Sequence, residues 1–194
     1  LWRITNDFWD SWEDIMEMFD RCNNWAPYVS EGCFPDCDML PVGHISIRGC
    51  EHGLSDRWTR LSKAEQRTML TLWNIFRSPL MIGCELTDMD EWTKALLTNE
   101  EVLSLLKTSR NAHQTIRQGD MIVWQAEGEE GNVFLAVFNT TNWSETFAID
   151  FRALDLTGSY KLRDLWAQKE LGEVEGKLIV GVDSHDAKLY KLSK

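Results

Sequence analysis

Trp2-Arg3-Ile4-Thr5-Asn6-Asp7-Phe8-Trp9-Asp10-Ser11-Trp12 is the stretch around which this chain is organised. Ile4 and Thr5 suit a short buried strand, Asp7 follows at its carboxyl end, and a helix begins just beyond. A carboxylate at the C-terminal end of a strand is where α/β barrels place catalytic groups. Apolar rings beside a carboxyl group raise its pKa by desolvation, as a general acid requires. The alternative is that Asp7 is a helix-entry residue and the neighbouring tryptophans belong to the core.

Apolar residues at helical spacing predict two helices in the first half of the chain. The first starts with Asp10 and Glu13, which have the spacing of an acidic cap and its partner. The second starts with Ser62 and Glu65, which form a capping box. The two predicted helices cover residues 10–22 and 62–77.

A buried strand and two further helical pieces follow. Residues 80–83 form a short continuous apolar run, which is typical of a buried parallel strand. Residues 90–97 and 98–106 are helical in pattern, and Thr98 with Glu101 repeats the cap spacing. Strands alternating with helices are the order expected of part of a parallel α/β barrel.

The sequence changes character near residue 112, where apolar and polar residues begin to alternate. Short strands separated by turns predict an antiparallel β-sandwich. We therefore predict two domains, an α/β barrel segment over residues 1–112 and a β-sandwich over residues 113–194. The predicted sandwich strands are residues 121–124, 133–138, 146–151, 159–162, 177–182 and 187–192.

Two more carboxylates lie close together after the first helix. Asp36 and Asp38 flank Cys37, so in an extended chain both carboxylates point to one face and Cys37 to the other. The loop of residues 43–53 follows, and loops after barrel strands form active-site walls. A histidine in such a loop is either a substrate contact or a surface residue. The chemically active side chains of this loop are His44, Arg48 and His52.

Composition narrows the classes of partner. The formal net charge is −11, with 43% hydrophobic and 26% charged residues, which indicates a globular protein. The acidic balance argues against nucleic acid and against an anionic membrane surface, and it is compatible with a neutral sugar. The chain contains no apolar run of roughly 18 residues, the length needed to span a bilayer.

The five cysteines form an odd number and lack the spacing of a zinc site, so we expect no metal there. Two glycosylation sequons, Asn139-Thr140-Thr141 and Asn142-Trp143-Ser144, have meaning only on a secretory route. The cysteines alone do not decide the compartment, and we expect a secreted or periplasmic location.

Several motifs occur in a fixed order along the chain. After residues 2–12 they are Phe34-Pro35-Asp36-Cys37-Asp38-Met39-Leu40, Leu72-Trp73, Ser78-Pro79-Leu80, Leu96-Leu97-Thr98-Asn99-Glu100-Glu101-Val102 and Leu162-Arg163-Asp164-Leu165-Trp166. This series resembles family 27 glycoside hydrolases, the α-galactosidase family. The resemblance covers the second half of the family's (β/α)8 TIM barrel and its C-terminal β domain.

The resemblance implies a retaining exo-glycosidase that uses two aspartates, acts on terminal α-galactosyl groups and needs no cofactor. Carried over by position, Asp7 resembles the acid/base and Arg3 resembles a substrate-binding residue. Asp38 and Met39 resemble residues that line the galactose pocket. The family also implies β-L-arabinopyranose and N-acetylgalactosamine as substrate variants. A different alternative is a non-catalytic carbohydrate-binding or structural fragment.

The family's nucleophile lies on an earlier barrel strand, in a Lys-Tyr/Phe-Asp type motif that has no match in this chain. Half a barrel leaves strand edges unpaired, so we expect this chain to be a segment of a longer polypeptide or to be completed by a second chain. A further departure lies at residues 103–109, where the family often has Asn-Gln-Asp.

Overall fold

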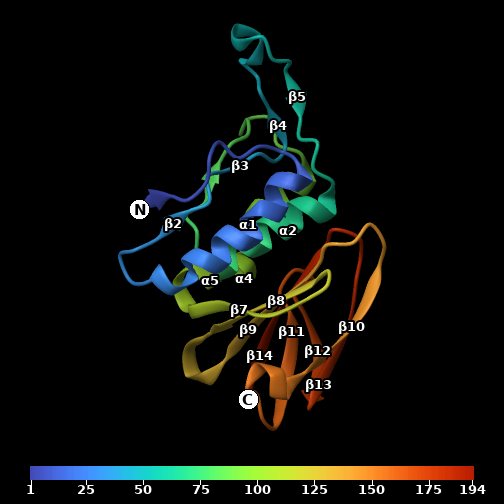
Figure 1. The fold of residues 1–194 in the computed structure, drawn as a ribbon. Helices are drawn as coiled ribbons and strands as arrows, with labels where there is room; N and C mark the ends of the chain where they lie inside the picture. Colours follow the sequence, from blue (N-terminus) through green and yellow to red (C-terminus); the bar gives the residue numbers. More distant parts are fainter.

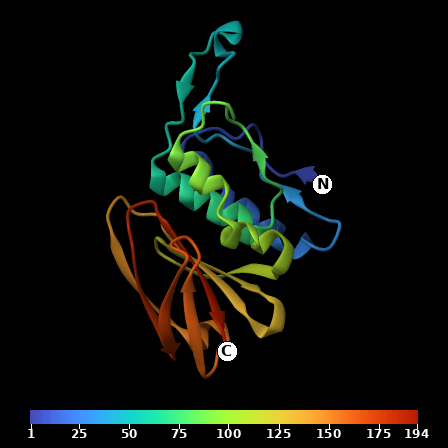
Figure 2. The same cartoon turned by 180° about the vertical axis from the view of Figure 1, so that it is seen from behind.

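A central helix, α2 (Lys63–Phe76), lies between two layers of the molecule. The computed structural model covers residues 1–194 and describes every side chain except that of His52. Figure 2 shows α1 (Trp12–Trp25) and α3 (Glu91–Leu97) on either side of α2, and both views show the β-sandwich below the helices. Short strands lie above the helices, and a long hairpin projects away from the sandwich.

Helix α2 starts as the sequence predicts. The Ser62 hydroxyl accepts a hydrogen bond from the Glu65 backbone N–H, and the Glu65 carboxylate accepts one from the Ser62 N–H. Buried positions run around nearly the whole helix from Thr68 to Phe76, because one side contacts the short strands and the other contacts the sandwich. A helix that is buried all round is held by tertiary packing rather than by its own propensity.

The N-cap of helix α1 lies one residue later than predicted. This N-cap is Ser11, whose hydroxyl accepts from the Asp14 N–H at 3.1 Å. Asp10 does not act as a cap because its buried carboxylate binds Arg57 instead. The helix continues to Trp25 and passes into the 3-10 turn η1 (Ala26–Tyr28).

The strands of the first region are short and partly parallel. β1 (Trp2–Arg3) pairs with β2 (Pro35–Asp36), and β3 (Met39–Leu40) pairs with β6 (Met81–Ile82), both in parallel. Met81 and Ile82 are 44% and 49% exposed, so the strand predicted here exists but its side chains are not buried as expected. The described residues form no closed barrel, and the observed architecture is a mixed α/β region.

The loop predicted over residues 43–53 is part of a hairpin. β4 (His44–Ile45) pairs in antiparallel fashion with β5 (Arg57–Trp58), and the 3-10 turn η2 (Gly49–His52) lies at its tip. Two short helices, α4 (Glu100–Leu103) and α5 (Leu105–Thr108), complete the first region. The N-cap of α4 is Asn99 rather than the predicted Thr98, and its side chain accepts from the backbone N–H groups of Glu101 and Val102.

The second region is the predicted antiparallel β-sandwich. Its larger sheet has the strand order β12-β11-β14-β9-β8-β7, and its smaller sheet pairs β10 with β13. The sequence did not predict β7 and β12, because both are edge strands with few buried residues and little apolar alternation. The strands are β7 (Arg110–Gln118), β8 (Met121–Glu127), β9 (Val133–Asn139), β10 (Glu145–Asp150), β11 (Ser159–Asp164), β12 (Lys169–Glu175), β13 (Lys177–Val182) and β14 (Ala187–Ser193).

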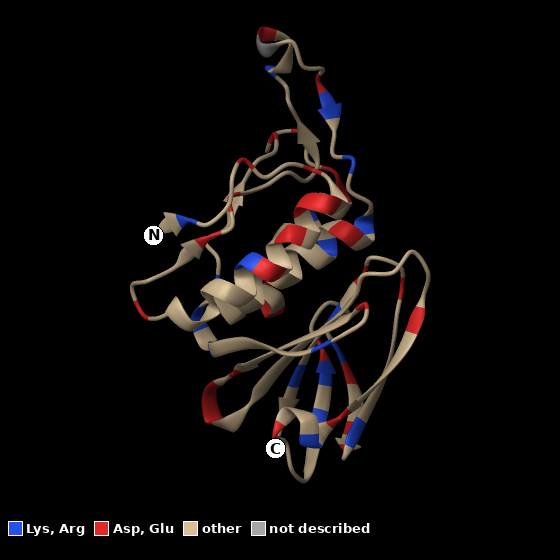
Figure 3. Cartoon of the chain, in the orientation of Figure 1, with Lys and Arg blue, Asp and Glu red and all other residues tan. Residues whose placement is uncertain are grey.

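The central strands β8 and β9 of the larger sheet are buried on both faces. On β8, Val123 faces the smaller sheet, while Ile122 and Trp124 face the helices. The same division along β9 explains why these strands are continuously apolar in sequence. Figure 3 shows lysine and arginine interspersed with aspartate and glutamate on the sandwich strands.

The first sequon has a structural role. Asn139 is buried at the end of β9, and its side-chain amide donates to the backbone carbonyls of Trp143, Val182 and Asp183. The side-chain amide of Asn139 therefore holds the loop that follows β9. A glycan could be attached to this amide only if these hydrogen bonds were broken.

Polar contacts join α2 to the turn before β14. Arg67 Nε donates to Asp186 Oδ1 at 2.8 Å, and Thr68 Oγ1 donates to the His185 carbonyl at 2.7 Å. The His185 ring stacks on Trp12 at 3.9 Å between centroids. These contacts fix the sandwich against both long helices.

A second set of contacts joins the sandwich to the short helices. Arg163 forms a bidentate ion pair with Glu101, at 2.6 and 2.7 Å. Trp166 Nε1 donates to Thr71 Oγ1 at 2.9 Å, and Asn99 donates to the Leu165 carbonyl at 3.0 Å. The sandwich is therefore attached along the length of α2.

We predict that Arg67→Met lowers the free energy of unfolding by about 3 kcal/mol, because it leaves the buried Asp186 carboxylate without its cation. Urea denaturation measures the change. Arg152→Met is the control, since Arg152 and its partner Asp150 lie at the surface. Loss of this surface ion pair should leave the urea midpoint unchanged. Equal midpoints for both variants would contradict a structural role for the Arg67 contact.

Candidate functional site

Three of the predicted site residues lie together. Arg3 Nη2 donates to Asp7 Oδ1 at 3.0 Å, and Arg3 Nη1 donates to Asp38 Oδ2 at 3.4 Å. Arg3 therefore bridges two carboxylates that are more than thirty residues apart in sequence. We refer to Arg3, Asp7 and Asp38 as the carboxylate cluster.

Parallel pairing of β1 with β2 builds this cluster. Arg3 lies opposite Asp36, so the chain segments leaving the two strands emerge at the same edge. Asp7 follows β1 and Asp38 follows β2, which places both near the carboxyl ends of parallel strands. This is the edge at which α/β folds position reactive groups.

Asp38 is held by its own backbone and by its neighbours. Its φ of 72° lies in the left-handed region, which only a few non-glycine residues adopt, most often asparagine and aspartate. Its Oδ2 accepts from the Phe8 N–H at 2.9 Å, and its Oδ1 accepts from the Met39 N–H at 2.8 Å. The Asp38 carboxylate therefore fixes the segment after β1 and also accepts the hydrogen bond from Arg3.

The predicted alternation of Asp36, Cys37 and Asp38 is wrong in detail, because the left-handed turn at Asp38 interrupts the extended chain. The Asp36 carboxylate is buried and accepts from the Asp38 N–H at 2.8 Å, so it supports the turn. Cys37 points into the core, where its Sγ lies 3.6 Å from that of Cys22. Neither is in a disulfide, and burial raises the pKa of the Cys22 thiol well above its usual range.

The tryptophans of the first stretch have different environments. Trp2 packs against Trp25 at 5.5 Å, and Trp12 stacks on His185, so both are partly buried against the core. Trp9 is exposed beside the hairpin. Asp7 is 76% exposed on its side chain, so the aromatic rings do not desolvate it as the sequence suggested.

Met39 directly follows Asp38 and is the first residue of β3. Its side chain contacts Gly83, where an added Cβ would come within 3.0 Å of Met39 Sδ and 3.1 Å of the Leu40 carbonyl. Gly83 thus permits the close approach of β3 and β6, and any larger residue there would displace Met39.

The hairpin is attached to the cluster region by an ion pair that the sequence did not predict. Arg57 on β5 donates to both carboxylate oxygens of Asp10, at 2.5 and 2.7 Å. Burial acts to raise the pKa of Asp10, but the hydrogen bonds from Arg57 and from the Arg60 N–H outweigh it and lower the pKa overall. The residues are 47 positions apart, and no local pattern signals such a contact.

His44 is the only one of the predicted loop histidines whose side chain is described, since that of His52 lies outside the described residues. Its Nδ1 lies 2.6 Å from Asp88 Oδ2, and its Nε2 contacts Asp56. The ring also stacks on Trp58. Hydrogen bonds to Asp56 and Asp88 raise the pKa of His44, which favours the imidazolium between two carboxylates.

Among the described residues, no group of three or more histidine, cysteine or acidic side chains has the arrangement of a metal site. In the same part of the chain, no helix has the length and apolarity that a membrane crossing requires. The carboxylate cluster can instead exchange protons and form hydrogen bonds to the hydroxyl groups of a ligand.

Two family models match the chain. The model described as "Alpha galactosidase A" matches residues 1–108, and the one described as "Alpha galactosidase C-terminal beta sandwich domain" matches residues 118–192. The predicted domain boundary at residue 112 falls between the two matches and within β7.

Curated relatives include an α-galactosidase from Oryza sativa, 29% identical over 99% of the chain, and one from Coffea arabica, 30% identical over 99%. The chain spans 43% and 48% of the lengths of these relatives.

Solved structures are also similar. A family 27 β-L-arabinopyranosidase from Geobacillus stearothermophilus is 48% identical, with a TM-score of 0.95 over 100% of this chain and 44% of its own. A Bacillus halodurans protein provisionally described as an α-N-acetylgalactosaminidase is 38% identical, with a TM-score of 0.89 over 98% of this chain and 46% of its own.

We predict that the His44 ring titrates above pH 6.5 in the folded protein, because both of its nitrogens face carboxylates. With a raised folded pKa, its contribution to the stability of the hairpin is complete below about pH 6.5. That contribution is lost as the pH rises through the raised pKa.

Histidine proton NMR of the full-length protein measures this pKa. The double variant Asp56→Asn, Asp88→Asn should lower it towards the ordinary value, and a wild-type pKa at or below 6.5 would contradict the geometry.

Proposed function

The chain belongs to glycoside hydrolase family 27, the α-galactosidase family, and on this premise we propose that it carries the acid/base half of the active site of a retaining exo-glycosidase. The proposed substrate is a terminal α-D-galactosyl group. Support comes from the α-galactosidases among its relatives and from the geometry of the carboxylate cluster. In this proposal residues 1–112 are the C-terminal half of a TIM barrel and residues 113–194 are its C-terminal domain.

The observation that carries the proposal is the meeting of Arg3, Asp7 and Asp38 at the ends of parallel strands. Asp7 is solvent-accessible and carries its carboxyl group outward, whereas Asp38 is held in place by backbone N–H groups. An accessible carboxyl group can reach the glycosidic oxygen of a bound substrate, and a fixed one can position that substrate. We assign Asp7 as the acid/base, and Arg3, Asp38 and Met39 as substrate-binding residues.

In the proposed mechanism the protonated Asp7 carboxyl group gives its proton to the glycosidic oxygen as the bond to the anomeric carbon breaks. A second carboxylate attacks that carbon and forms a glycosyl–enzyme ester. The Asp7 carboxylate then takes a proton from water, whose oxygen displaces the enzyme carboxylate with a second inversion and hence net retention. Arg3 holds Asp7 beside the departing oxygen and donates to sugar hydroxyl groups.

The attacking carboxylate is proposed to come from the first half of the barrel, on the same polypeptide or on a second chain. Exposure of Met81 and Ile82 on β6 supports this, because strands of a parallel sheet are normally covered on both faces. The unpaired edges of the β1–β2 and β3–β6 pairs would also be covered.

A second substrate has a specific observation in its favour. The Geobacillus β-L-arabinopyranosidase is 48% identical to this chain, whereas the plant α-galactosidases are 29–30% identical. β-L-Arabinopyranose has the ring and hydroxyl configuration of α-D-galactose without the exocyclic hydroxymethyl group. The same acid/base half-site therefore serves either sugar, and selection would depend on the space left for that group.

We predict that Asp7→Asn in the full-length protein lowers kcat/KM about 10³-fold for glycosides with poor leaving groups. An activated aryl glycoside should lose far less, because its leaving group departs without a proton. Steady-state kinetics on the two substrate types measures the difference, and an equal loss on both would exclude Asp7 as the acid.

The sugar preference has its own test. Comparison of kcat/KM for 4-nitrophenyl α-D-galactopyranoside and β-L-arabinopyranoside, which share one leaving group, gives the preference directly. We expect at least one to be hydrolysed with retention, and the larger value identifies the sugar. Hydrolysis of neither would contradict the proposed function.

A further inference from the structure

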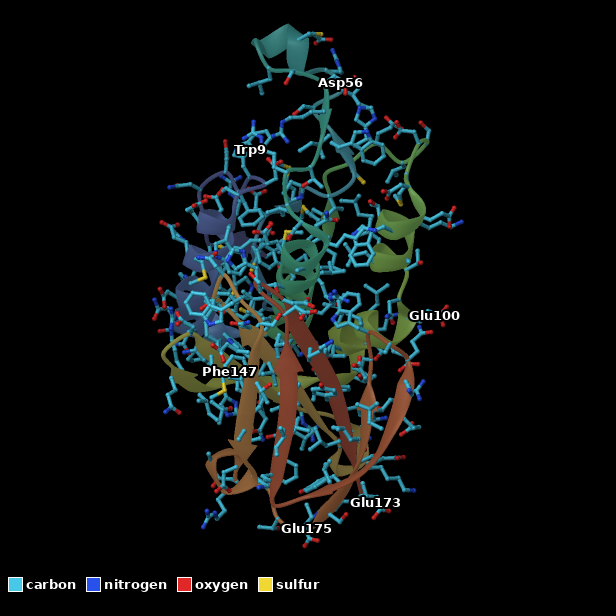
Figure 4. The ribbon with its side chains drawn as sticks, turned by 90° about the vertical axis from the view of Figure 1, so that its right-hand side faces the viewer. Trp9, Asp56, Glu100, Phe147, Glu173 and Glu175 are labelled. Carbon is cyan, nitrogen blue, oxygen red and sulfur yellow. The ribbon has the colours of Figure 1, made fainter. Side chains whose placement is uncertain are left out.

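An apolar pocket lies between the hairpin and the strand ends beside the carboxylate cluster. Its volume is about 270 Å³, close to the lower end of the range for small-molecule sites. The hairpin contributes Ile45 and Leu54, and the opposite wall is formed by Trp9, Met39 and Gly83. Figure 4 places Trp9 towards the end of the molecule where the hairpin and Asp56 lie, far from Phe147, Glu173 and Glu175 on the sandwich.

The position of the pocket relates it to the proposed acid. Trp9 is two residues beyond Asp7, and Met39 directly follows Asp38, so the pocket adjoins the cluster on the hairpin side. A general acid of a glycosidase lies beside the oxygen of the leaving group. The part of the substrate that leaves must therefore lie near Asp7, where the pocket beside Trp9 offers it an apolar surface.

The lining of the pocket indicates the chemistry of its occupant. Trp9, Leu54 and Met39 present apolar surface, and Trp9 and Leu54 are 41% and 53% exposed. Arg48 is the charged residue among the described lining residues, and Glu51 neutralises it through hydrogen bonds of 2.9 and 2.7 Å. An apolar aromatic ring fits this lining better than a second sugar, whose hydroxyl groups would need hydrogen-bond partners.

Contacts within the chain itself hold both walls of the pocket. The carboxylate of Asp10, the residue after Trp9, is bound by Arg57 of the hairpin, so one ion pair fixes both walls. The Trp9 N–H also donates to Asp14 Oδ2 at 3.1 Å, and the Leu54 N–H donates to the Gly49 carbonyl at 2.8 Å. An apolar pocket held in this way lowers the entropic cost of ordering the bound group.

We propose that this pocket is the aglycone subsite of the enzyme and takes an aromatic aglycone, with Trp9 and Leu54 as specificity-determining residues. The proposal rests on the proposed glycosidase function and adds the class of leaving group to it. Trp9 offers a ring face to the aglycone, and Leu54 closes the pocket from the hairpin side.

The test compares benzyl and methyl glycosides of the sugar that the full-length protein cleaves. Benzyl alcohol and methanol have similar acidity, so the ratio of the two kcat/KM values reports aglycone binding rather than leaving-group chemistry. We expect the wild-type protein to favour the benzyl glycoside by about tenfold or more.

Leu54→Ala should lower this ratio by about fivefold, chiefly through the benzyl glycoside, and Trp9→Ala should lower it at least as much. Leu171→Ala and Trp143→Ala are the matched controls, because these residues are similarly exposed on the sandwich and should leave the ratio unchanged. Leu54 is a surface residue of the hairpin, so its variant is expected to fold.

A wild-type ratio near one would overturn the aglycone subsite while leaving the glycosidase function intact, and so would a ratio that neither Leu54→Ala nor Trp9→Ala changes. Failure of the wild-type protein to hydrolyse either glycoside would overturn the proposed function and this inference together.

Discussion

Burial of helix α2 on two sides is the constraint on which the rest of the structure depends. One side supports the short parallel strands, where Trp73 Nε1 donates to the Asp38 carbonyl at 3.3 Å. The other side packs on the six-stranded sheet and holds it through Arg67, Thr68 and Thr71. The sandwich therefore supports the α/β region through its contacts with α2. A displacement of α2 would therefore move the Asp38 backbone through the hydrogen bond that Trp73 donates to it.

Two long-range ion contacts then define the opposite end of the molecule. Arg3 joins Asp7 to Asp38, and Arg57 joins the hairpin to Asp10. Asp7 and Asp10 lie on one short segment between β1 and α1, so the two contacts fix this segment from either side. The first provides an accessible carboxyl group with a cation beside it, and the second shapes the apolar pocket. The proposed acid/base chemistry and the proposed recognition of the leaving group thus depend on the same short connection.

The sequence predicts those parts of the structure that local sequence patterns determine. The structure confirms the capping box of Ser62 and Glu65, the apolar periodicity of α2 and most of the sandwich strands. β7 and β12 were missed because edge strands need no apolar alternation, and the cap of α1 was misplaced because distant Arg57 engages Asp10. Among the site residues, motif resemblance selected Arg3, Asp7, Asp38 and Met39, and their roles remain proposals. The left-handed turn at Asp38 and the pocket under the hairpin depend on tertiary contacts that no short pattern encodes.

The most direct test of the account is chemical rescue of Asp7→Ala in the full-length protein, with an activated aryl glycoside and added azide. Such a substrate forms the glycosyl–enzyme without an acid, but water then needs a base to attack. Azide needs none, so it should raise turnover and yield a glycosyl azide with the anomeric configuration of the substrate. Absence of rescue would contradict an acid/base role for Asp7, and a glycosyl azide of inverted configuration would make Asp7 the nucleophile instead.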